Sequence, residues 1–382
     1  MPTLAAQIER AFAAEQANPT VPRSRADIPQ SYEAIGSEWL TDVLCQDVPE
    51  AAITGCSLGP ADDGTNNRRR IFITYNEAGR RAGLPASVFC KSTQGLANRL
   101  MLGHSGGVLC EVTFWNVARH LLDIEAPTAR FASYDPVSYN SIVLLDDLGS
   151  EATFCSEGTQ VDRNFVEQQL ALLARLHGRF FQAPELNGAL AVLPDWVQRF
   201  RNLMGFHLEE SCEAGVRAAE SFLPPSLFAR RADIWPTTLR SLDVLRDLPK
   251  TLCHGDVHLK NWYVRKDGTV GLSDWGVSHI GHWSRDLAYT MATSLTVENR
   301  RAWERDMIAY YLDQLEARGV AKVTFDEAFL RYRQSLPTAF AFWTLTLKPT
   351  PDFPDMQPAA TARTFIERMA WAIDDLDVLG SV

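Results

Sequence analysis

This sequence of 382 residues lacks the features that mark membrane, secreted and nucleic-acid-binding proteins. It has no run of eighteen apolar residues, so no membrane span is expected. Residues 1–20 carry charges through their first turns instead of an unbroken apolar core, so we expect no secretory signal. The formal net charge of −10 argues against a nucleic-acid partner. Residues 1–147 hold 17 acidic and 12 basic residues, and residues 148–382 hold 30 and 25, so each part has a net charge of −5. The charge is evenly distributed and therefore does not indicate the class of substrate.

Cysteine pairs and glycine-rich phosphate loops are missing too. The seven cysteines are odd in number and form no CxxC pair, so neither a zinc site nor a disulfide framework is expected, and a reducing cytoplasm is the expected compartment. No internal repeat and no low-complexity stretch occurs. GxGxxG and the Walker motif GxxxxGK[ST], which cradle phosphates in many proteins, are absent.

The residue pattern of the first part of the chain is typical of β-strands. β-Branched, aromatic and apolar residues separated by turn residues predict strands at 53–58, 71–75, 86–90 and 141–145. Residues 111–122 place Val112, Trp115, Ala118 and Leu122 at helical spacing. We predict a β-rich N-terminal domain over 1–147, in which 1–35 form an extension of helix and coil.

The remainder, 148–382, reads as mainly helical. Apolar residues at helical spacing predict helices within 161–181, 195–245 and 296–318. One β element interrupts them, a hairpin of 262–264 and 270–272 around a Lys-Asp-Gly turn. The fold class is therefore predicted to be α+β, with two lobes.

The residues on either side of this hairpin carry the strongest chemical signal. His254-Gly255-Asp256 and Asn261 precede the hairpin, and Asp274 follows it. Phosphoryl transfer needs a carboxylate that orients and deprotonates the attacking hydroxyl, and oxygen ligands for Mg²⁺ on the nucleotide phosphates. A short hairpin presents both groups from its two ends. The pattern predicts Asp256 as the base, and Asn261 and Asp274 as the metal ligands.

This pattern, HGDxHxxN followed by a hairpin and a DxG-like motif, resembles the aminoglycoside-phosphotransferase and choline-kinase superfamily. It is most similar to the bacterial ecdysteroid-kinase-like branch. The resemblance implies a two-lobed protein-kinase-like fold and a small-molecule kinase that uses ATP and Mg²⁺. It implies a catalytic loop of His254-Gly255-Asp256, in which His254 usually braces the loop. It also implies that Asp286, in Arg285-Asp286-Leu287-Ala288, is a bracing residue.

The resemblance extends upstream and covers about residues 35 to 320. It implies that Lys91 contacts the α/β-phosphates and pairs with Glu111, and that the backbone at Asp146 and Leu148 holds the adenine. The phosphate loop departs from the usual pattern, and here we predict backbone contacts from Gly64, Thr65 and Asn66. Asp62 and Asp63 are awkward neighbours for a triphosphate.

The acceptor is the least defined part of the prediction. Large apolar side chains gather in two C-terminal segments: Trp196, Phe200, Met204, Phe206 and His207, and Phe340, Phe342, Trp343 and Leu345. They predict either a pocket for an apolar alcohol, such as a sterol, terpenoid or hydroxyacyl chain, or simply the helical core. A cationic aminoglycoside would need carboxylates, for which only the run 209–213 is a candidate. An aromatic cage for choline has no distinctive support.

Three functional classes stay open. An active small-molecule O-phosphotransferase is favoured because its full set of groups is present. A catalytically silent kinase-fold binding protein is the second class. A protein kinase is the third, and the lack of an APE motif and of a long activation segment after Asp274 argues against it. We expect a small-molecule hydroxyl acceptor as partner, and a monomer or homodimer.

Overall fold

The structure is a computed structural model that describes residues 3–349 and 356–382. The chain divides into two compact units. The first comprises residues up to Asn116 together with Pro127–Glu151, and the second comprises Val117–Ala126 and Ala152 onward. The change at 151/152 lies close to the predicted boundary at 147/148, but the excursion 117–126 was not anticipated.

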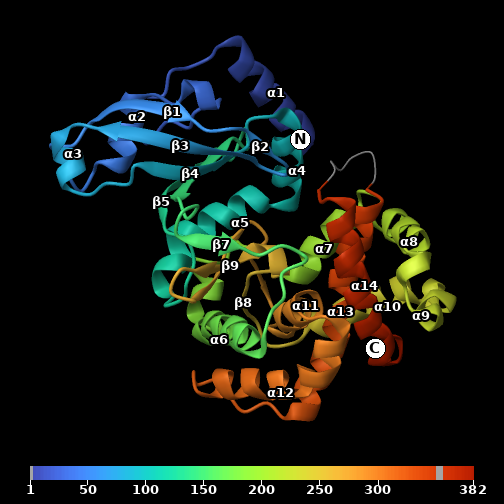
Figure 1. Cartoon of the computed structure of the whole chain (residues 1–382). Helices are drawn as coiled ribbons and strands as arrows, with labels where there is room; N and C mark the ends of the chain where they lie inside the picture. The colour runs from blue at the N-terminus through green and yellow to red at the C-terminus, as the bar shows by residue number, and fades with distance from the viewer. Residues whose placement is uncertain (1–2, 350–355) are drawn as a thin grey trace. The chain divides into compact units, whose positions relative to one another are not determined.

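An antiparallel sheet forms the centre of the first unit (Figure 1). Its order is β1-β3-β4-β6-β5, with β2 added to β3. The strands are β1 (Ile53–Leu58), β2 (Asp62–Asp63), β3 (Asn67–Tyr75), β4 (Ser87–Ser92), β5 (Ala129–Tyr134) and β6 (Ser141–Asp146). In β3, Ile71, Ile73 and Tyr75 are buried while the residues between them are exposed, as the two-residue period of a strand requires. The buried face packs against α2 (Ser37–Leu44) through Trp39 and Leu40.

Short helices complete the first unit: α1 (Leu4–Ala17), α3 (Glu77–Arg81), α4 (Leu96–Ser105) and α5 (Gly107–Thr113). Arg99 fastens α1 to α4, because its buried guanidinium bonds to Glu15 at 2.6 Å and to the Thr93 carbonyl at 2.9 Å. The predicted helix at 111–122 is wrong in its bounds. The helix begins at Gly107 and changes into a π-helical turn (114–118) and a 3₁₀ turn (119–121).

The second unit is mainly helical, with two small antiparallel sheets. The predicted hairpin is β9 (Trp262–Arg265) and β10 (Val270–Leu272), and β7 (Ala152–Phe154) joins it as a third strand. A second sheet pairs β8 (Thr251–Cys253) with β11 (His279–Gly281). The helices are α6 (Arg163–Phe180), α7 (Trp196–Met204), α8 (Leu208–Ala218), α9 (Pro225–Ala229), α10 (Ile234–Arg246), α11 (Ser284–Ser294), α12 (Val297–Glu316), α13 (Phe325–Leu347) and α14 (Ala359–Asp375). The α+β class is confirmed.

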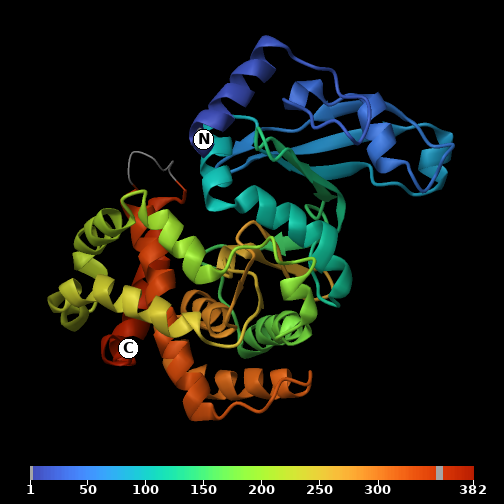
Figure 2. The ribbon, with the colours of Figure 1, turned by 180° about the vertical axis from the view of Figure 1, so that it is seen from behind.

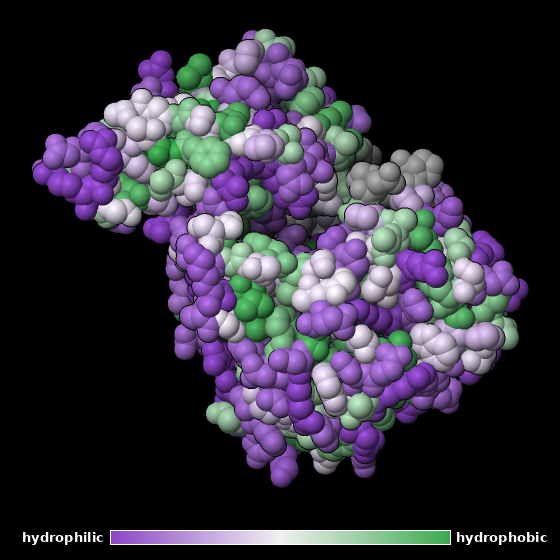
Figure 3. Space-filling view, in the orientation of Figure 1, coloured by the Kyte–Doolittle hydropathy of each residue, from purple (hydrophilic) through white to green (hydrophobic). Residues whose placement is uncertain are grey.

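The long helix α13 packs against α8, α10, α11 and α14, and α6 packs against α12 (Figure 2). Helix α11 is buried along its whole length, which holds its side chains firmly against the segments around it. None of the helices in the described residues combines the length and the apolar composition that crossing a bilayer requires. The face drawn in Figure 3 is mostly hydrophilic, with hydrophobic side chains scattered over it.

Candidate active site

The catalytic loop runs from β8 to the 3₁₀ turn Leu259–Asn261 that leads into β9. Gly255 adopts φ +87° within it, a conformation that favours glycine. A Cβ there would also lie 2.5 Å from the Val277 carbonyl oxygen. The glycine of the HGD motif therefore has a geometric cause, since this backbone leaves no room for a side chain.

Helix α11 braces this loop. Asp286 accepts the backbone N–H of His254 at 2.7 Å and that of Gly255 at 3.0 Å, one on each carboxylate oxygen. Arg285 donates to the Gly255 carbonyl at 2.6 Å. Burial alone would raise the pKa of Asp286, but the hydrogen bond and the charge of His177 hold that pKa below its usual value. An ionised Asp286 thus fixes the backbone of the catalytic loop.

His177, Cys253 and Asp286 form a buried group whose ligand atoms lie within 4.8 Å of one another. This group has the composition of a metal site, yet its ligands are already engaged. Both Asp286 oxygens accept backbone N–H groups, and His177 Nδ1 lies 2.7 Å from the Tyr311 hydroxyl. Burial raises the pKa of the Cys253 thiol well above its usual value. We interpret the group as a hydrogen-bonded brace.

The Asp256 carboxylate is held at both oxygens while its side chain stays 29% exposed. Oδ1 accepts the Tyr289 hydroxyl at 2.9 Å, and Oδ2 accepts Asn261 Nδ2 at 3.2 Å and lies 3.4 Å from His258 Nε2. Burial works against its ionisation, but the charge and hydrogen bond of His258, with smaller contributions from His254 and Tyr289, hold the pKa of Asp256 below its usual value. Asp256 is thus an oriented carboxylate that is ionised at neutral pH.

Asn261 and Asp274, the predicted metal ligands, are linked through Ser273. The N–H and the hydroxyl of Ser273 both donate to the Asn261 carbonyl at 2.8 Å. The Asn261 side-chain NH₂ donates to two Asp256 oxygens, so Oδ1 is the atom of this side chain that could bind a metal. Asp274 sits at φ +62°, a strained conformation that is common at functional sites. An amide oxygen and a carboxylate suit Mg²⁺, so these residues fit the ion that the resemblance implies.

His254 uses both ring nitrogens to brace the loop. Nε2 lies 2.9 Å from the Ser273 carbonyl, and Nδ1 accepts the Asp256 N–H at 3.1 Å. This pairing fixes the neutral tautomer with hydrogen on Nε2, and burial lowers the pKa of His254 in agreement. The structure therefore gives His254, predicted as part of the catalytic set, a positioning role.

In the first unit, Lys91 and Glu111 form the predicted ion pair. The distance from Lys91 Nζ to Glu111 Oε1 is 2.7 Å, and both side chains are buried. Lys91 lies near the end of β4 and Glu111 lies within α5. A strand and a helix thus hold the ammonium in a fixed position.

We expect Lys91→Met to abolish turnover and to lower the free energy of unfolding by about 3 kcal/mol, because it removes the cation beside a buried carboxylate. Thermal and chemical unfolding measure the second effect. Lys91→Met/Glu111→Gln should regain much of the stability but none of the activity. The matched control is Arg81→Met, which breaks the exposed pair with Glu77 and should change stability by less than about 1 kcal/mol. Equal losses in Lys91→Met and the control would contradict a special role for the buried pair.

The predicted phosphate loop is held by a residue that the sequence did not single out. Asn98 Nδ2 donates to the carbonyls of Gly64 and Thr65 at 3.0 and 2.9 Å. The carbonyl of Asn66 accepts the Gly64 N–H.

The aspartates of this loop, which had seemed awkward, have partners of their own. Asp62 pairs with Arg68 at 3.0 Å, and Asp63 accepts Asn67 Nδ2 at 2.9 Å. Because both carboxylates have partners, their presence is compatible with a phosphate-binding loop.

The predicted adenine-binding segment follows β6. The Asp146 carboxylate is occupied by Arg130, at 2.6 and 3.2 Å, and its backbone N–H donates to Thr128. Leu148 is buried, and its carbonyl accepts the Glu151 N–H. The side chain of Asp146 therefore links β6 to its neighbour β5 through Arg130.

Most of the predicted acceptor-site residues belong to the helical core. Phe200, Phe340 and Leu345 are buried, and Trp196 and Phe200 pack with Trp235 in one cluster. The acidic run lies on the solvated face of α8, where Glu209, Glu210 and Glu213 are exposed. Glu210 lies 3.5 Å from His207, and Glu213 lies 3.4 Å from Arg217. A cavity of ≈130 Å³ is lined by Cys212 and Glu213 of this run together with Trp235, and no residue of the catalytic loop lines it.

Around Asp256, one ring of the predicted acceptor segments is joined by two rings from other positions. Trp343 and Phe365 pack on His258 with ring centroids 5.3 and 5.8 Å away, and Tyr289 lies beside them at 6.3 Å. Of this group the sequence had singled out Trp343 for the acceptor site. Tyr289 was missed, although it follows Asp286 at the i,i+3 spacing that places two residues on one face of a helix.

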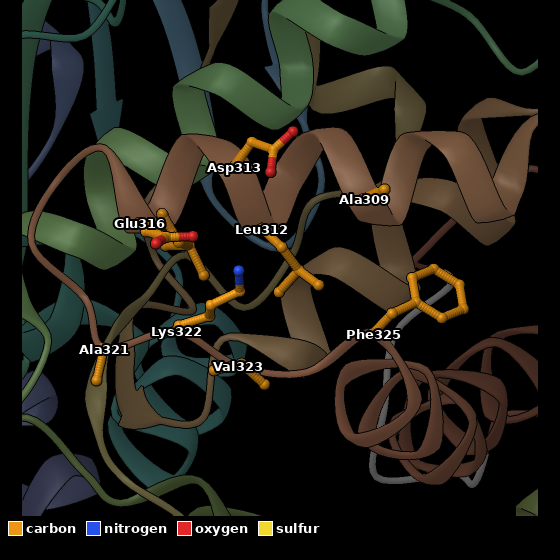
Figure 4. A pocket seen from close by; sticks show the side chains of 9 residues that line it. Ala309, Leu312, Asp313, Glu316, Ala321, Lys322, Val323 and Phe325 are labelled. Atoms are coloured by element: carbon orange, nitrogen blue, oxygen red, sulfur yellow. The ribbon is translucent and has the colours of Figure 1, made fainter.

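A pocket of ≈180 Å³ is lined by residues from another part of the chain. It is formed by α12 and the segment after it, and Figure 4 shows Lys322 extending toward the helix that carries Leu312, Asp313 and Glu316. Its lining residues lie between Ala309 and Phe325, so it shares none with the catalytic loop. We assign it no part in the chemistry.

Among known proteins, a family model matches the segment of the chain that carries the catalytic loop. Residues 143–323 match the model of the phosphotransferase enzyme family, a segment that includes Asp256, Asn261 and Asp274. A protein of Caenorhabditis elegans named uncharacterized oxidoreductase dhs-27 is 30% identical over 112 residues, which are 24% of this chain and 14% of that protein. The chain thus spans a small part of this curated relative.

Similar folds occur among solved structures. A Ralstonia eutropha protein provisionally described as an aminoglycoside phosphotransferase has a TM-score of 0.51 at 12% identity, over 84% of this chain and 93% of that one. The GDP complex of an aminoglycoside 2′-phosphotransferase-IIIa variant has a TM-score of 0.49 at 13% identity, over 88% and 96%. Choline kinase LicA from Streptococcus pneumoniae has 0.46 at 13% identity, over 87% and 97%. The first of these likenesses concerns the fold alone, and it confirms the kinase-like class.

The family match supports the superfamily that the sequence predicts. It also supports an enzyme of the phosphotransferase class that acts on hydroxyl groups of small molecules. The ecdysteroid-kinase-like branch stays a prediction.

Proposed function

We propose that this chain is an ATP-dependent O-phosphotransferase that moves the γ-phosphoryl group onto the hydroxyl of a small apolar alcohol. The observation that carries the proposal is the fixed Asp256 carboxylate, held at both oxygens by Tyr289 and Asn261 and still partly exposed. A general base needs this combination of orientation and access. The family match over the same segment supports it.

In this proposal Asp256 orients the acceptor hydroxyl and takes its proton late in a loose transition state. Asn261 Oδ1 and the Asp274 carboxylate hold Mg²⁺, which when bound would neutralise charge on the nucleotide phosphates. His254 keeps Asp256 and the Ser273-Asp274 segment in register by its two hydrogen bonds.

The residues of the first unit are assigned to the nucleotide. Lys91, positioned by Glu111, contacts the α/β-phosphates. Within the predicted loop, the Gly64 N–H is already bonded to the Asn66 carbonyl, so the amides of Thr65 and Asn66 are the ones assigned to the phosphates. The backbone at Asp146 and Leu148 holds the adenine. We place the activity in the cytoplasm and in a monomer or homodimer.

The apolar acceptor is proposed because the surroundings of Asp256 are aromatic, although the rings of Tyr289, Trp343 and Phe365 are themselves buried and pack on His258 and one another. A cationic aminoglycoside or amino alcohol would need carboxylates near the base, and the acidic run of α8 is an ordinary solvated face. Sterols, terpenoids and hydroxyacyl compounds are therefore the first acceptors to test.

The test is a coupled assay of Mg²⁺-dependent ADP release over a library of sterols, terpenoids, hydroxyacyl-CoAs, antibiotics and amino alcohols, repeated with GTP. We expect an apolar alcohol to raise turnover above the rate with water. If aminoglycosides were the only compounds that raised turnover, the proposed acceptor would change from an apolar alcohol to an antibiotic. Tight Mg·ATP binding without turnover on any hydroxyl compound would indicate a catalytically silent binding protein.

A further inference from the structure

The hydroxyl of Tyr289 has one defined hydrogen-bond direction. Trp343 Nε1 lies 2.7 Å from it, and an indole N–H can only donate, so the hydroxyl oxygen is the acceptor of that bond. The single hydroxyl hydrogen is then directed to Asp256 Oδ1, 2.9 Å away, since an ionised carboxylate can only accept. Two hydrogen bonds thus form a chain in which Trp343 of α13 donates to Tyr289 of α11, and Tyr289 donates to Asp256 of the catalytic loop.

Both members of this series are held in place by packing. Tyr289 is 3% exposed, and Arg285 lies against its ring with Cζ 5.5 Å from the centroid. Trp343 is equally buried and packs edge-on against Phe365 at 4.8 Å. Burial and the neighbouring Asp256 charge raise the pKa of Tyr289 well above its usual value, so its hydroxyl keeps the hydrogen it donates.

We propose that Tyr289 is a positioning residue for the base, and that Trp343 orients the Tyr289 hydroxyl so that it fixes Asp256 Oδ1. This inference rests on the proposed function, because it concerns the same base. With Oδ1 tied to Tyr289 and Oδ2 near Asn261 and His258, the carboxylate plane cannot rotate freely. A base displaced by about 1 Å can lose a factor of about 10² in rate, so this tether matters for turnover.

The alternative is that Trp343 and Tyr289 merely satisfy each other as buried polar groups. In that case removal of the hydroxyl costs stability, because it leaves a buried indole N–H without its acceptor, but it does not change kcat. Stability and turnover therefore separate the two roles.

The experiment compares Tyr289→Phe, Trp343→Phe and the double variant with the unsubstituted protein. ADP release from Mg·ATP is measured with water and with the best alcohol from the library, together with the Kd for Mg·ATP and thermal unfolding. We expect Tyr289→Phe to lower kcat about 10- to 100-fold while the KM and Kd for nucleotide stay within about twofold. The double variant should regain stability and show no further loss of kcat, because Trp343 acts through the hydroxyl.

The matched control is Tyr332→Phe, which removes an equally buried hydroxyl on α13 that donates to Glu304 of α12, 3.4 Å away, instead of to Asp256. It should leave kcat unchanged. A kcat of Tyr289→Phe within twofold of the unsubstituted protein, with Asp256→Asn inactive, overturns the positioning role alone. Losses that multiply in the double variant also overturn it. Full turnover by Asp256→Asn overturns the proposed function and this inference together.

Discussion

Replacement of Asp256 by asparagine is expected to lower kcat by about 10³-fold, with the Kd for Mg·ATP within about twofold of the unsubstituted protein. The size follows from the contribution of general-base catalysis, typically 10²- to 10⁴-fold. Asparagine keeps the shape of the side chain and one acceptor oxygen, so the Tyr289 hydroxyl retains a partner. What is lost is the capacity to take a proton, together with the bond from Asn261 Nδ2, which then faces an NH₂ group instead of an oxygen.

The measurement is a full kinetic profile of ADP release against ATP and acceptor, beside isothermal titration with Mg·ATP. Asp267→Asn is the matched control, since it makes the same chemical change in the exposed turn of the β9–β10 hairpin, where the side chain accepts hydrogen bonds from Thr269. It should leave kcat unchanged. Comparable activity in Asp256→Asn and the control would refute the assignment of the base.

The part of the site near the hairpin could be predicted because it is local in sequence. Asp256, Asn261 and Asp274 are linked by a tight loop and by two strands that pair directly, so spacing alone brings them together. The pairing of Lys91 with Glu111 could be predicted from the resemblance, and the structure places the lysine near the end of a strand and the glutamate within a helix.

The supporting residues could not be predicted because their contacts depend on long-range packing. Tyr289 is 33 residues from Asp256, and Trp343 is a further 54 residues away. Because the whole of α11 is buried, burial does not distinguish a side chain that faces the catalytic loop from one that faces α13, and the i,i+3 spacing from Asp286 is the one signal for Tyr289. The same holds for Asn98, whose bonds to Gly64 and Thr65 join a helix to a turn more than thirty residues earlier.

Aromatic residues in helices were the least informative signal. Phe200 and Phe340 have the composition of a ligand pocket, yet both are fully buried in the helical core. Large apolar side chains lower the free energy by burial wherever they lie, so their presence in a sequence does not distinguish a pocket from a core. The residues that approach the base are instead defined by polar contacts to it.

Asp274→Asn is expected to remove the Mg²⁺-dependent part of nucleotide binding and to lower kcat/KM by about 10²- to 10³-fold, the scale of losing one preorganised electrostatic contact. Asp274→Asn tests the metal ligand more specifically than Asp274→Ala. Asp274 has φ +62°, a region that asparagine tolerates well, whereas alanine would add backbone strain to the loss of the ligand. Asparagine also keeps an oxygen and removes only the charge.

The measurement is the Kd for ATP with and without Mg²⁺, for the unsubstituted protein, Asp274→Asn and Asp274→Ala. The Kd without Mg²⁺ should be similar in all three, because in the proposed function the carboxylate would contact the metal and not the nucleotide. With Mg²⁺, only the unsubstituted protein should gain affinity. Thermal unfolding should separate the variants further, with Asp274→Ala less stable than Asp274→Asn by about 1 kcal/mol because of its left-handed backbone. Tight Mg²⁺-dependent ATP binding in Asp274→Ala would show that the metal is held elsewhere, and would leave the strained backbone at Asp274 to be explained by its tie through Ser273 to Asn261.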